Sequence, residues 1–324
     1  MSFSFGAFIV EAVFGKDGAC AFALGDGTVR FASGETIEAH PDAGIQCAAA
    51  HPSGVGVVSG GDDGRLVWST VEGAKELASV GGKWIDAVAA SAESNLIAFA
   101  CSRDVRVIDA RDAKFSRTFS HERSVANLAF DAKGRRLACA TYGGAALWFA
   151  RIEGQKPTML KWAGSHVGVV FSPDGKFLIS CMQDNALHGW RIADAKDMRM
   201  GGYPAKPKSL CFLAHGGLLA TSGAEGAVVW PFAGANGPMG KQAAEIGHED
   251  GARVTRVAGL PERPVLAAGL EDGRVWIADL TAKGVERIRA DKAAAISALA
   301  LSPDGRRLAW GDEDGEAGIV EVSL

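Results

Sequence analysis

The sequence has 324 residues, of which 48% are hydrophobic and 22% are charged, and its formal net charge is −4. This composition is typical of a folded globular protein and excludes a disordered chain, because disorder requires low hydrophobicity together with high net charge. No run of more than two lysines or arginines occurs, which argues against binding to nucleic acid or to an anionic membrane surface.

The sequence carries no signal for export or for membrane insertion. Residues Met1–Gly6 lack the basic and apolar regions of a signal peptide, and no stretch reaches the roughly 20 apolar residues that a spanning helix needs. The six cysteines show no Cys-x-x-Cys spacing and lie in apolar stretches, so we expect reduced thiols in the core. These observations predict a cytoplasmic protein.

One motif recurs along the whole chain: an apolar strand that ends at a tight turn. It is clearest at Phe171–Gly175 and Leu301–Gly305, where Ser-Pro-Asp-Gly follows the strand and supplies strong turn chemistry. In chain order, the anchor residues before these turns are Phe14, Ala50, Ala90, Phe130, Phe171, Phe212, Gly259 and Leu301. Successive anchors lie 36 to 47 residues apart, and such a period indicates a repeat architecture. The sequence therefore predicts eight copies of one unit.

Each unit contains three further predicted strands. A second turn, such as Gly61–Gly64, follows the first, and the apolar run between the two turns predicts a strand that is covered on both faces. A third strand often ends in an aromatic residue such as Trp190, and a more polar fourth strand follows. Four short antiparallel strands in about 40 residues are typical of a propeller blade. We therefore predict an all-β fold in which residues 1–324 form a single domain, a closed eight-bladed β-propeller, with seven blades as the runner-up.

The two ends of the chain are predicted to meet in the last unit. This unit has no fourth strand of its own after Ile319–Val322. Ser2–Phe5 alternates polar and apolar residues, as a strand does. We expect this segment to supply the missing outer strand and to close the propeller, which removes free sheet edges.

The repeat resembles the WD-repeat β-propeller family over essentially the whole chain. Gly247-His248, Ser172–Gly175 and Glu271–Gly273 match the family's Gly-His pair, Ser-Pro-Asp-Gly turn and Asp-Gly turn, although no unit has a full Trp-Asp pair. The resemblance implies a buried network of His, Ser, Asp and Trp side chains in one unit. The residues placed to form it are His40, Ser59, Asp63 and Trp68. The resemblance also implies structural roles for the histidines before the first strand, which are His40, His121 and His248.

The sequence contains no recognised catalytic or phosphate-binding motif. There is no His-Glu-x-x-His, no Gly-x-Ser-x-Gly and no Gly-x-x-x-x-Gly-Lys-Ser/Thr. We therefore predict no catalytic residue, no metal site and no cofactor. An alternative is an enzyme, or a protein that binds a small molecule or metal, with its site at the mouth of the central channel. The polar residues on the predicted innermost strands that would serve it are Glu11, Asp86, Asn127 and Arg256.

A binding surface on the top face of the propeller is the better-supported prediction. Trp84 and Trp162 fall in predicted loops and not at packing positions of the repeat, and Trp, Tyr and Arg are enriched in binding hot spots. Alternatively, both tryptophans cap the ends of blades. The residues predicted to contact a partner are Trp84, Arg103, Arg123, Tyr142, Trp162, His166 and Gln183.

These observations together predict a non-catalytic scaffold for protein–protein interaction. We expect its partner to be another protein or a peptide, and we expect neither nucleic acid nor a membrane. We also expect a monomer. The sequence names neither the partner nor the pathway.

Overall fold

The computed structural model describes residues 1–282 and 284–323, and nearly all the regular structure there is β-strand. Contacts within the chain divide it into two compact units, one of residues 7–171 and one of residues 1–6 with 172–324. In the described residues, no helix has both the length and the apolar character that crossing a membrane requires.

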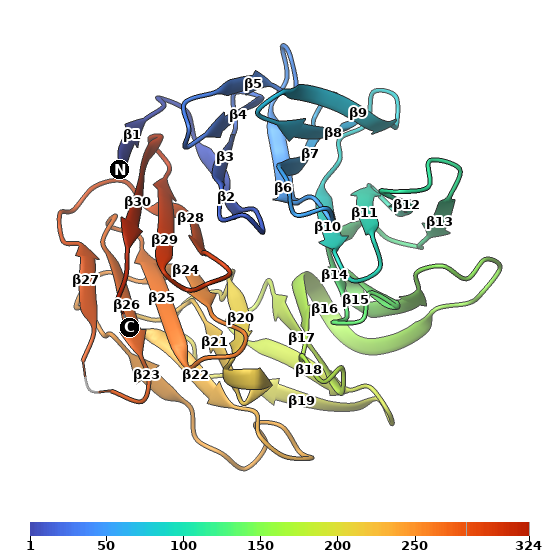
Figure 1. Ribbon diagram of the computed structural model, residues 1–324. Helices are drawn as coiled ribbons and strands as arrows, with labels where there is room; N and C mark the ends of the chain where they lie inside the picture. Colours follow the sequence, from blue (N-terminus) through green and yellow to red (C-terminus); the bar gives the residue numbers. More distant parts are fainter. Residues whose placement is uncertain (283, 324) are drawn as a thin grey trace. The chain divides into compact units, whose positions relative to one another are not determined.

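The unit of residues 7–171 contains three four-stranded antiparallel sheets and three further strands (Figure 1). The first sheet is β2 (Ile9–Phe14), β3 (Cys20–Leu24), β4 (Thr28–Phe31) and β5 (Thr36–Glu38). The second is β6 (Ile45–Ala50), β7 (Val57–Gly61), β8 (Arg65–Thr70) and β9 (Gly73–Ser79). The third is β10 (Ala87–Ser91), β11 (Leu96–Cys101), β12 (Asp104–Asp109) and β13 (Ser116–Ser120). The further strands are β14 (Val125–Phe130), β15 (Arg136–Phe149) and β16 (Thr158–Phe171).

The other unit begins with three strands and continues with three four-stranded sheets. The first strands are β17 (Phe177–Met182), β18 (Leu187–Arg191) and β19 (Lys196–Met200). One sheet is β20 (Leu210–Leu213), β21 (Leu218–Thr221), β22 (Ala227–Pro231) and β23 (Ala244–Ile246), with the 3-10 helix η1 (Ala214–Gly216) after β20. The next is β24 (Val254–Gly259), β25 (Val265–Leu270), β26 (Val275–Asp279) and β27 (Glu286–Arg289). The last is β28 (Ile296–Leu301), β29 (Arg307–Asp312), β30 (Glu316–Glu321) and β1 (Ser2–Ser4).

The strand pattern predicted for one unit is confirmed along the chain. Each of the eight predicted anchors is the last or last-but-one residue of a strand. The second strands β3 and β11 are buried at every residue, whereas the fourth strand β5 is mostly exposed. This is the burial expected when an inner strand is covered on both faces and an outer strand meets solvent.

The number of sheets differs from the prediction. The described residues form seven hydrogen-bonded sheets and not eight, because β14 to β19 make one six-stranded sheet. β15 and β16 are each 14 residues long and uninterrupted, where the sequence predicted a turn at 142–144 and a loop around Trp162. Gly143 and Gly144 have positive φ and bend β15 at a register shift without ending it. The predicted count of eight is therefore not confirmed, and the runner-up count of seven agrees with the sheets observed.

The N-terminal segment completes the last sheet, as predicted. β1 pairs antiparallel with β30, with Ser2 opposite Gly318, and the two strands lie side by side in Figure 1. The Met1 ammonium donates a hydrogen bond of 2.8 Å to the carbonyl of Ile319. β30 therefore has a hydrogen-bonded neighbour on both sides.

The cysteines behave as core residues. All six are free thiols, and four of them are buried. Burial raises the pKa of Cys47, Cys181 and Cys211 to about 12. A reactive cysteine needs a lowered pKa, so the raised pKa values of these three thiols disfavour reactivity.

Candidate functional site

The predicted contact residues are mostly exposed. The side chains of Trp84, Tyr142 and Trp162 are 59%, 65% and 37% exposed, and Arg103, Arg123 and Gln183 are exposed as well. The alternative that Trp84 caps the end of a blade as a core residue does not fit its exposure. His166, by contrast, is fully buried. Six of these residues lie in the unit of residues 7–171, while Gln183 lies in the other unit, where it accepts a hydrogen bond from the Lys206 ammonium.

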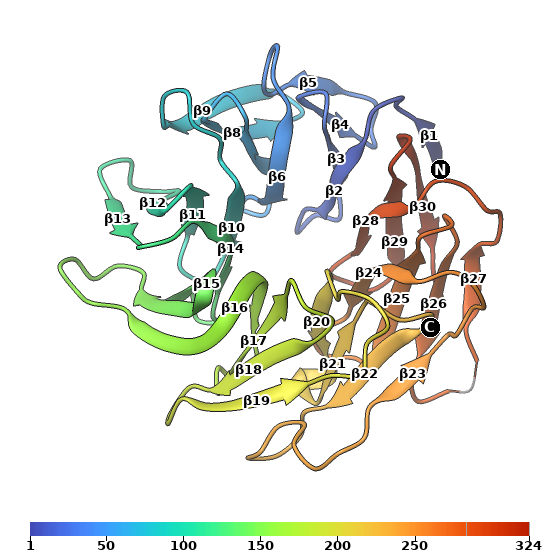
Figure 2. The ribbon, with the colours of Figure 1, turned by 180° about the vertical axis from the view of Figure 1, so that it is seen from behind.

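Three of the predicted residues share one hollow of about 540 Å³. Arg123, Tyr142 and His166 line it together with Ser124, Ala126 and Ser165. Tyr142 lies at the glycine bend of β15, directly opposite Ser165 of β16. Figure 2 shows β15 and β16 as two long neighbouring strands. The aromatic ring is therefore presented from a paired strand and not from a mobile loop. Trp84 and Arg103 are exposed elsewhere in this unit and do not line the hollow.

His166 belongs to the lining of this hollow, but its side chain is buried. Its Nε2–H donates a hydrogen bond of 3.1 Å to the carbonyl of Trp162, so it links two positions of the same strand β16. Burial lowers the pKa of His166. The predicted contact role is therefore replaced by a supporting one, because a fully buried ring offers little surface to a partner.

The network implied by the family resemblance is largely confirmed. His40 Nδ1–H donates to the Asp63 carboxylate at 3.0 Å, and the Ser59 hydroxyl lies 2.9 Å from Nε2. Burial lowers the pKa of His40 even though Asp63 acts in the opposite direction. Gly61 makes room for the network, since a Cβ there would lie 2.3 Å from His40 Nδ1. Trp68 is not a member; it donates to the carbonyl of Val55.

The register of the sheet explains why Trp68 is outside the network. Ser59 is paired with Val67 and Val58 with Trp68. Side chains alternate between the two faces of a strand, so Trp68 points to the face opposite that of Ser59. There its ring stacks on His51, with centroids 4.1 Å apart.

The other two histidines predicted to have structural roles, His121 and His248, differ in their surroundings. His121 has the predicted structural role: its Nε2 accepts a hydrogen bond of 3.0 Å from the indole of Trp148. His248 does not, because its side chain is 52% exposed. The strand pairing places Ala268 where Ser59 stands in the sheet of His40, and an alanine has no hydroxyl with which to hold the His248 ring.

Sequence analysis missed a further network built on a tyrosine. The Tyr203 hydroxyl lies 2.8 Å from the Thr221 hydroxyl and accepts a hydrogen bond of 2.7 Å from the Trp230 indole. Burial raises the pKa of Tyr203 to about 12. Tyr203 precedes Thr221 by 18 residues, close to the 19 residues between His40 and Ser59. A search for any hydrogen-bonding ring at that spacing would have found it.

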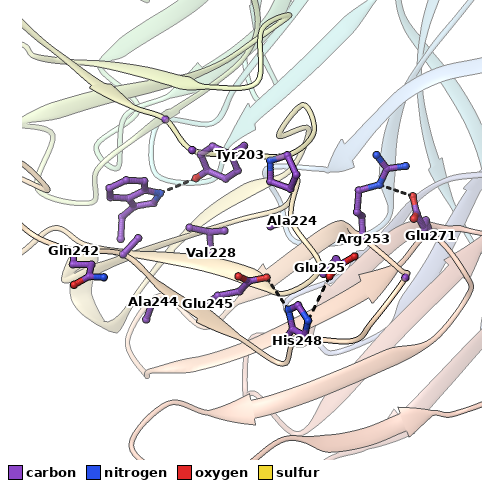
Figure 3. A pocket seen from close by; sticks show the side chains of 16 residues that line it. Tyr203, Ala224, Glu225, Val228, Gln242, Ala244, Glu245, His248, Arg253 and Glu271 are labelled. Atoms are coloured by element: carbon purple, nitrogen blue, oxygen red, sulfur yellow. Dashed lines mark hydrogen bonds and ion pairs between the residues drawn. The ribbon is translucent and has the colours of Figure 1, made fainter.

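A larger pocket, of about 770 Å³, lies beside Tyr203 in the unit of residues 172–324. Figure 3 shows Tyr203 on one side and Glu225, Glu245 and His248 on another. His248 Nδ1 lies 3.3 Å from Glu245, and its Nε2 lies 3.4 Å from Glu225 and 3.1 Å from Asp250. The hydrogen bonds to Glu245 and Asp250 raise the pKa of His248. One carboxylate oxygen each of Glu225 and Asp250 and an imidazole nitrogen of His248 all lie within 4.8 Å of one another, a spacing that a metal ion can bridge.

The polar residues suggested for a channel site are engaged with the backbone. Asp86 accepts a hydrogen bond of 3.1 Å from the amide of Ser102, and Asn127 accepts one of 3.1 Å from the amide of Val169. Arg256 donates one of 2.6 Å to a backbone carbonyl. Glu11 also has an interaction partner. These contacts give at least Asp86, Asn127 and Arg256 structural roles.

Comparisons with known proteins agree on the fold. The WD domain, G-beta repeat family matches residues 32–68 and 159–191. The first of these segments contains His40, Ser59 and Asp63. No curated protein matched the sequence.

Three of the similar solved structures cover between 86% and 100% of the chain at low identity. The computationally designed Ika8 protein is 16% identical with a TM-score of 0.77, and the match covers 98% of each chain. A chain of a mitotic checkpoint complex is 18% identical with a TM-score of 0.68, covering 100% of this chain and 91% of that one. The β-propeller domain of Cps50 (Swd1) from Myceliophteria thermophila is 16% identical with a TM-score of 0.66, covering 86% and 97%. The two matched segments and these propeller structures support the resemblance to the WD-repeat β-propeller family that the repeat motifs indicated.

Proposed function

We propose that this protein is a non-catalytic scaffold of the cytoplasm, and that another protein binds it at the hollow beside Tyr142. We propose in addition that it acts as a monomer, without a cofactor, nucleic acid or membrane as ligand. WD-repeat propellers are typical protein-interaction scaffolds, and one similar structure is a chain of a mitotic checkpoint complex.

The observation that carries this proposal is the exposure of Tyr142 on a paired strand. A ring that is 65% exposed and held by strand pairing loses little conformational freedom when a partner covers it. Tyrosine, tryptophan and arginine dominate binding hot spots, and Trp162 lies on the neighbouring strand β16. A protein segment that enters the hollow would place an apolar group against Tyr142.

Arg123 adds a preference for a negatively charged segment. Its side chain is exposed on the wall of the hollow and makes no ion pair within the described residues. A guanidinium group binds a carboxylate through two parallel hydrogen bonds. We therefore expect the bound segment to carry an aspartate or glutamate.

Affinity purification from the native host, followed by mass spectrometry, tests this proposal. We compare the unaltered protein with Tyr142→Ser and with the matched control Phe149→Ser, since Phe149 is 52% exposed on the same strand β15. Partners recovered by the unaltered protein and by the control are expected to be lost with Tyr142→Ser.

A purified partner then allows a quantitative measurement. Truncation of a hot-spot aromatic residue weakens the free energy of binding by about 2 kcal/mol or more. The dissociation constant of the partner complex, measured by calorimetry, should therefore be at least about tenfold higher for Tyr142→Ser. Equal recovery and equal affinity in all three proteins would show that the hollow is not the binding surface.

A further inference from the structure

The pocket beside Tyr203 has two chemically different walls. Tyr203, Pro204, Val228 and Trp230 form a largely apolar wall, of which Tyr203 and Val228 are labelled in Figure 3. The Tyr203–Trp230 hydrogen bond fixes both rings. Tyr203 is itself buried, so the apolar surface of this wall comes mainly from Pro204, Val228 and the flat ring of Trp230.

The opposite wall carries more negative than positive charge. The Arg253 guanidinium forms an ion pair of 3.0 Å with Glu271. The other two carboxylates that line the pocket, those of Glu225 and Glu245, are not paired with this arginine. Among the described residues, the carboxylates of Glu225, Glu245 and Asp250 all lie within salt-bridge distance of one imidazole, that of His248. Three carboxylates therefore face one imidazole at the edge of the pocket.

We infer that this pocket binds an arginine side chain of a second protein. The guanidinium group is planar, carries a permanent positive charge, and forms paired hydrogen bonds with carboxylates such as Glu225. Its alkyl stem fits along the apolar wall, and its flat face stacks on aromatic rings. The volume of 770 Å³ lies within the range of about 300–1,000 Å³ for ligand pockets.

A lysine or a metal ion suits the pocket less well. An ammonium group is compact and strongly hydrated, so it makes little use of a flat aromatic wall. A metal ion would need the carboxylate of Asp250, whose side chain is fully exposed, and Glu245 Oε1 already accepts a hydrogen bond of 2.7 Å from the amide of Gly226. The pocket shares no residue with the hollow beside Tyr142, so the two proposals can fail independently.

Fluorescence anisotropy with a defined peptide tests this inference. The probe is a labelled glycine–serine octapeptide with two central arginines, and the comparison peptide carries citrulline, which keeps the shape of arginine and removes its charge. Because a hydrogen bond to a charged group contributes about 1.5–3 kcal/mol, the arginine peptide is expected to bind at least roughly tenfold more tightly.

Two variants separate the pocket from general charge attraction. Glu225→Gln removes a carboxylate of the pocket and is expected to weaken binding of the arginine peptide about tenfold. Glu313→Gln makes the same change in net charge at an exposed turn residue of the same unit, outside the pocket, and is expected to leave binding within about twofold. Thermal unfolding of both variants checks that they fold, which the 41% exposure of the Glu225 side chain favours.

Three results would overturn the inference. The first is equal binding of the arginine and citrulline peptides, and the second is equal weakening by the two variants. The third is stoichiometric metal in the purified protein that disappears in Glu225→Gln, because the pocket would then be a metal site.

Discussion

His51 should make this protein less stable in mildly acidic solution. Its side chain is buried, stacks on Trp68 and accepts a hydrogen bond of 3.2 Å at Nδ1 from the amide of Ser53. A protonated ring cannot accept that bond. Burial, with a smaller contribution from Lys75, lowers the pKa of His51 to about 4.

The size of the effect follows from proton linkage. In the unfolded chain a histidine has a pKa of about 6.5, so at pH 5 the unfolded state binds the proton and the folded state does not. Stability from this lowered pKa is fully present above pH 6.5 and is lost as the pH falls toward 4. Between pH 7.5 and pH 5 the loss from His51 alone is about 2 kcal/mol.

Urea unfolding at pH 7.5 and at pH 5.0 measures this loss. His51→Asn keeps an acceptor near Ser53 and removes the titrating group, so its free energy of unfolding should fall by about 2 kcal/mol less than that of the unaltered protein over this interval. His215→Asn changes an exposed histidine and serves as the control. Equal losses in the unaltered protein and His51→Asn, or an NMR midpoint near 6.5 for the folded His51 ring, would show that His51 is not the source of the acid sensitivity.

Three further predictions concern the networks and the strand ends. Gly61→Ala should lower the free energy of unfolding by about 1–3 kcal/mol, because the added Cβ would lie 2.3 Å from His40 Nδ1. Gly201→Ala is the control, since no atom lies within contact distance of a Cβ at that position. Equal melting temperatures for the two variants would contradict the prediction. Tyr203→Phe removes the partner of Thr221 and Trp230 and should cost about 1–3 kcal/mol in urea unfolding, while Tyr142→Phe should cost almost nothing; similar values for both would count against the buried network. Deletion of residues 2–4 should leave β30 unpaired along one edge, and light scattering should show increased association; a molar mass equal to that of the unaltered protein would speak against it.

Much of the fold was predictable because its signals are local. A tight turn depends on its own few residues, and every anchor from Phe14 to Leu301 is the last or last-but-one residue of a strand. The uninterrupted course of β15 and β16 was not predictable in the same way. A Tyr-Gly-Gly sequence fits a turn or a bend within a strand equally well, and only the pairing of Tyr142 with Ser165 decides between them.

The site was less predictable because it depends on register and on distant segments. Trp68 is not part of the predicted network because the strand pairing places it opposite Val58 and not opposite Ser59. A shift of one residue in register moves a side chain to the other face of the sheet. Tyr203 forms a comparable network because a tyrosine hydroxyl can donate and accept hydrogen bonds, as an imidazole does. The pocket beside it draws its lining from separate stretches between residues 201 and 271, and no spacing in the sequence brings those stretches together.

The pairing of β1 with β30 also sets an order for folding in the cell. The hydrogen bond between Met1 and Ile319 joins residues 318 positions apart in the chain. At about 5–20 residues per second, the ribosome takes roughly 15–60 s to make β30 after β1 has been made. During that interval β1 lacks its partner strand β30, so β1 is made before the other strands of this sheet and is among the last of them to be paired.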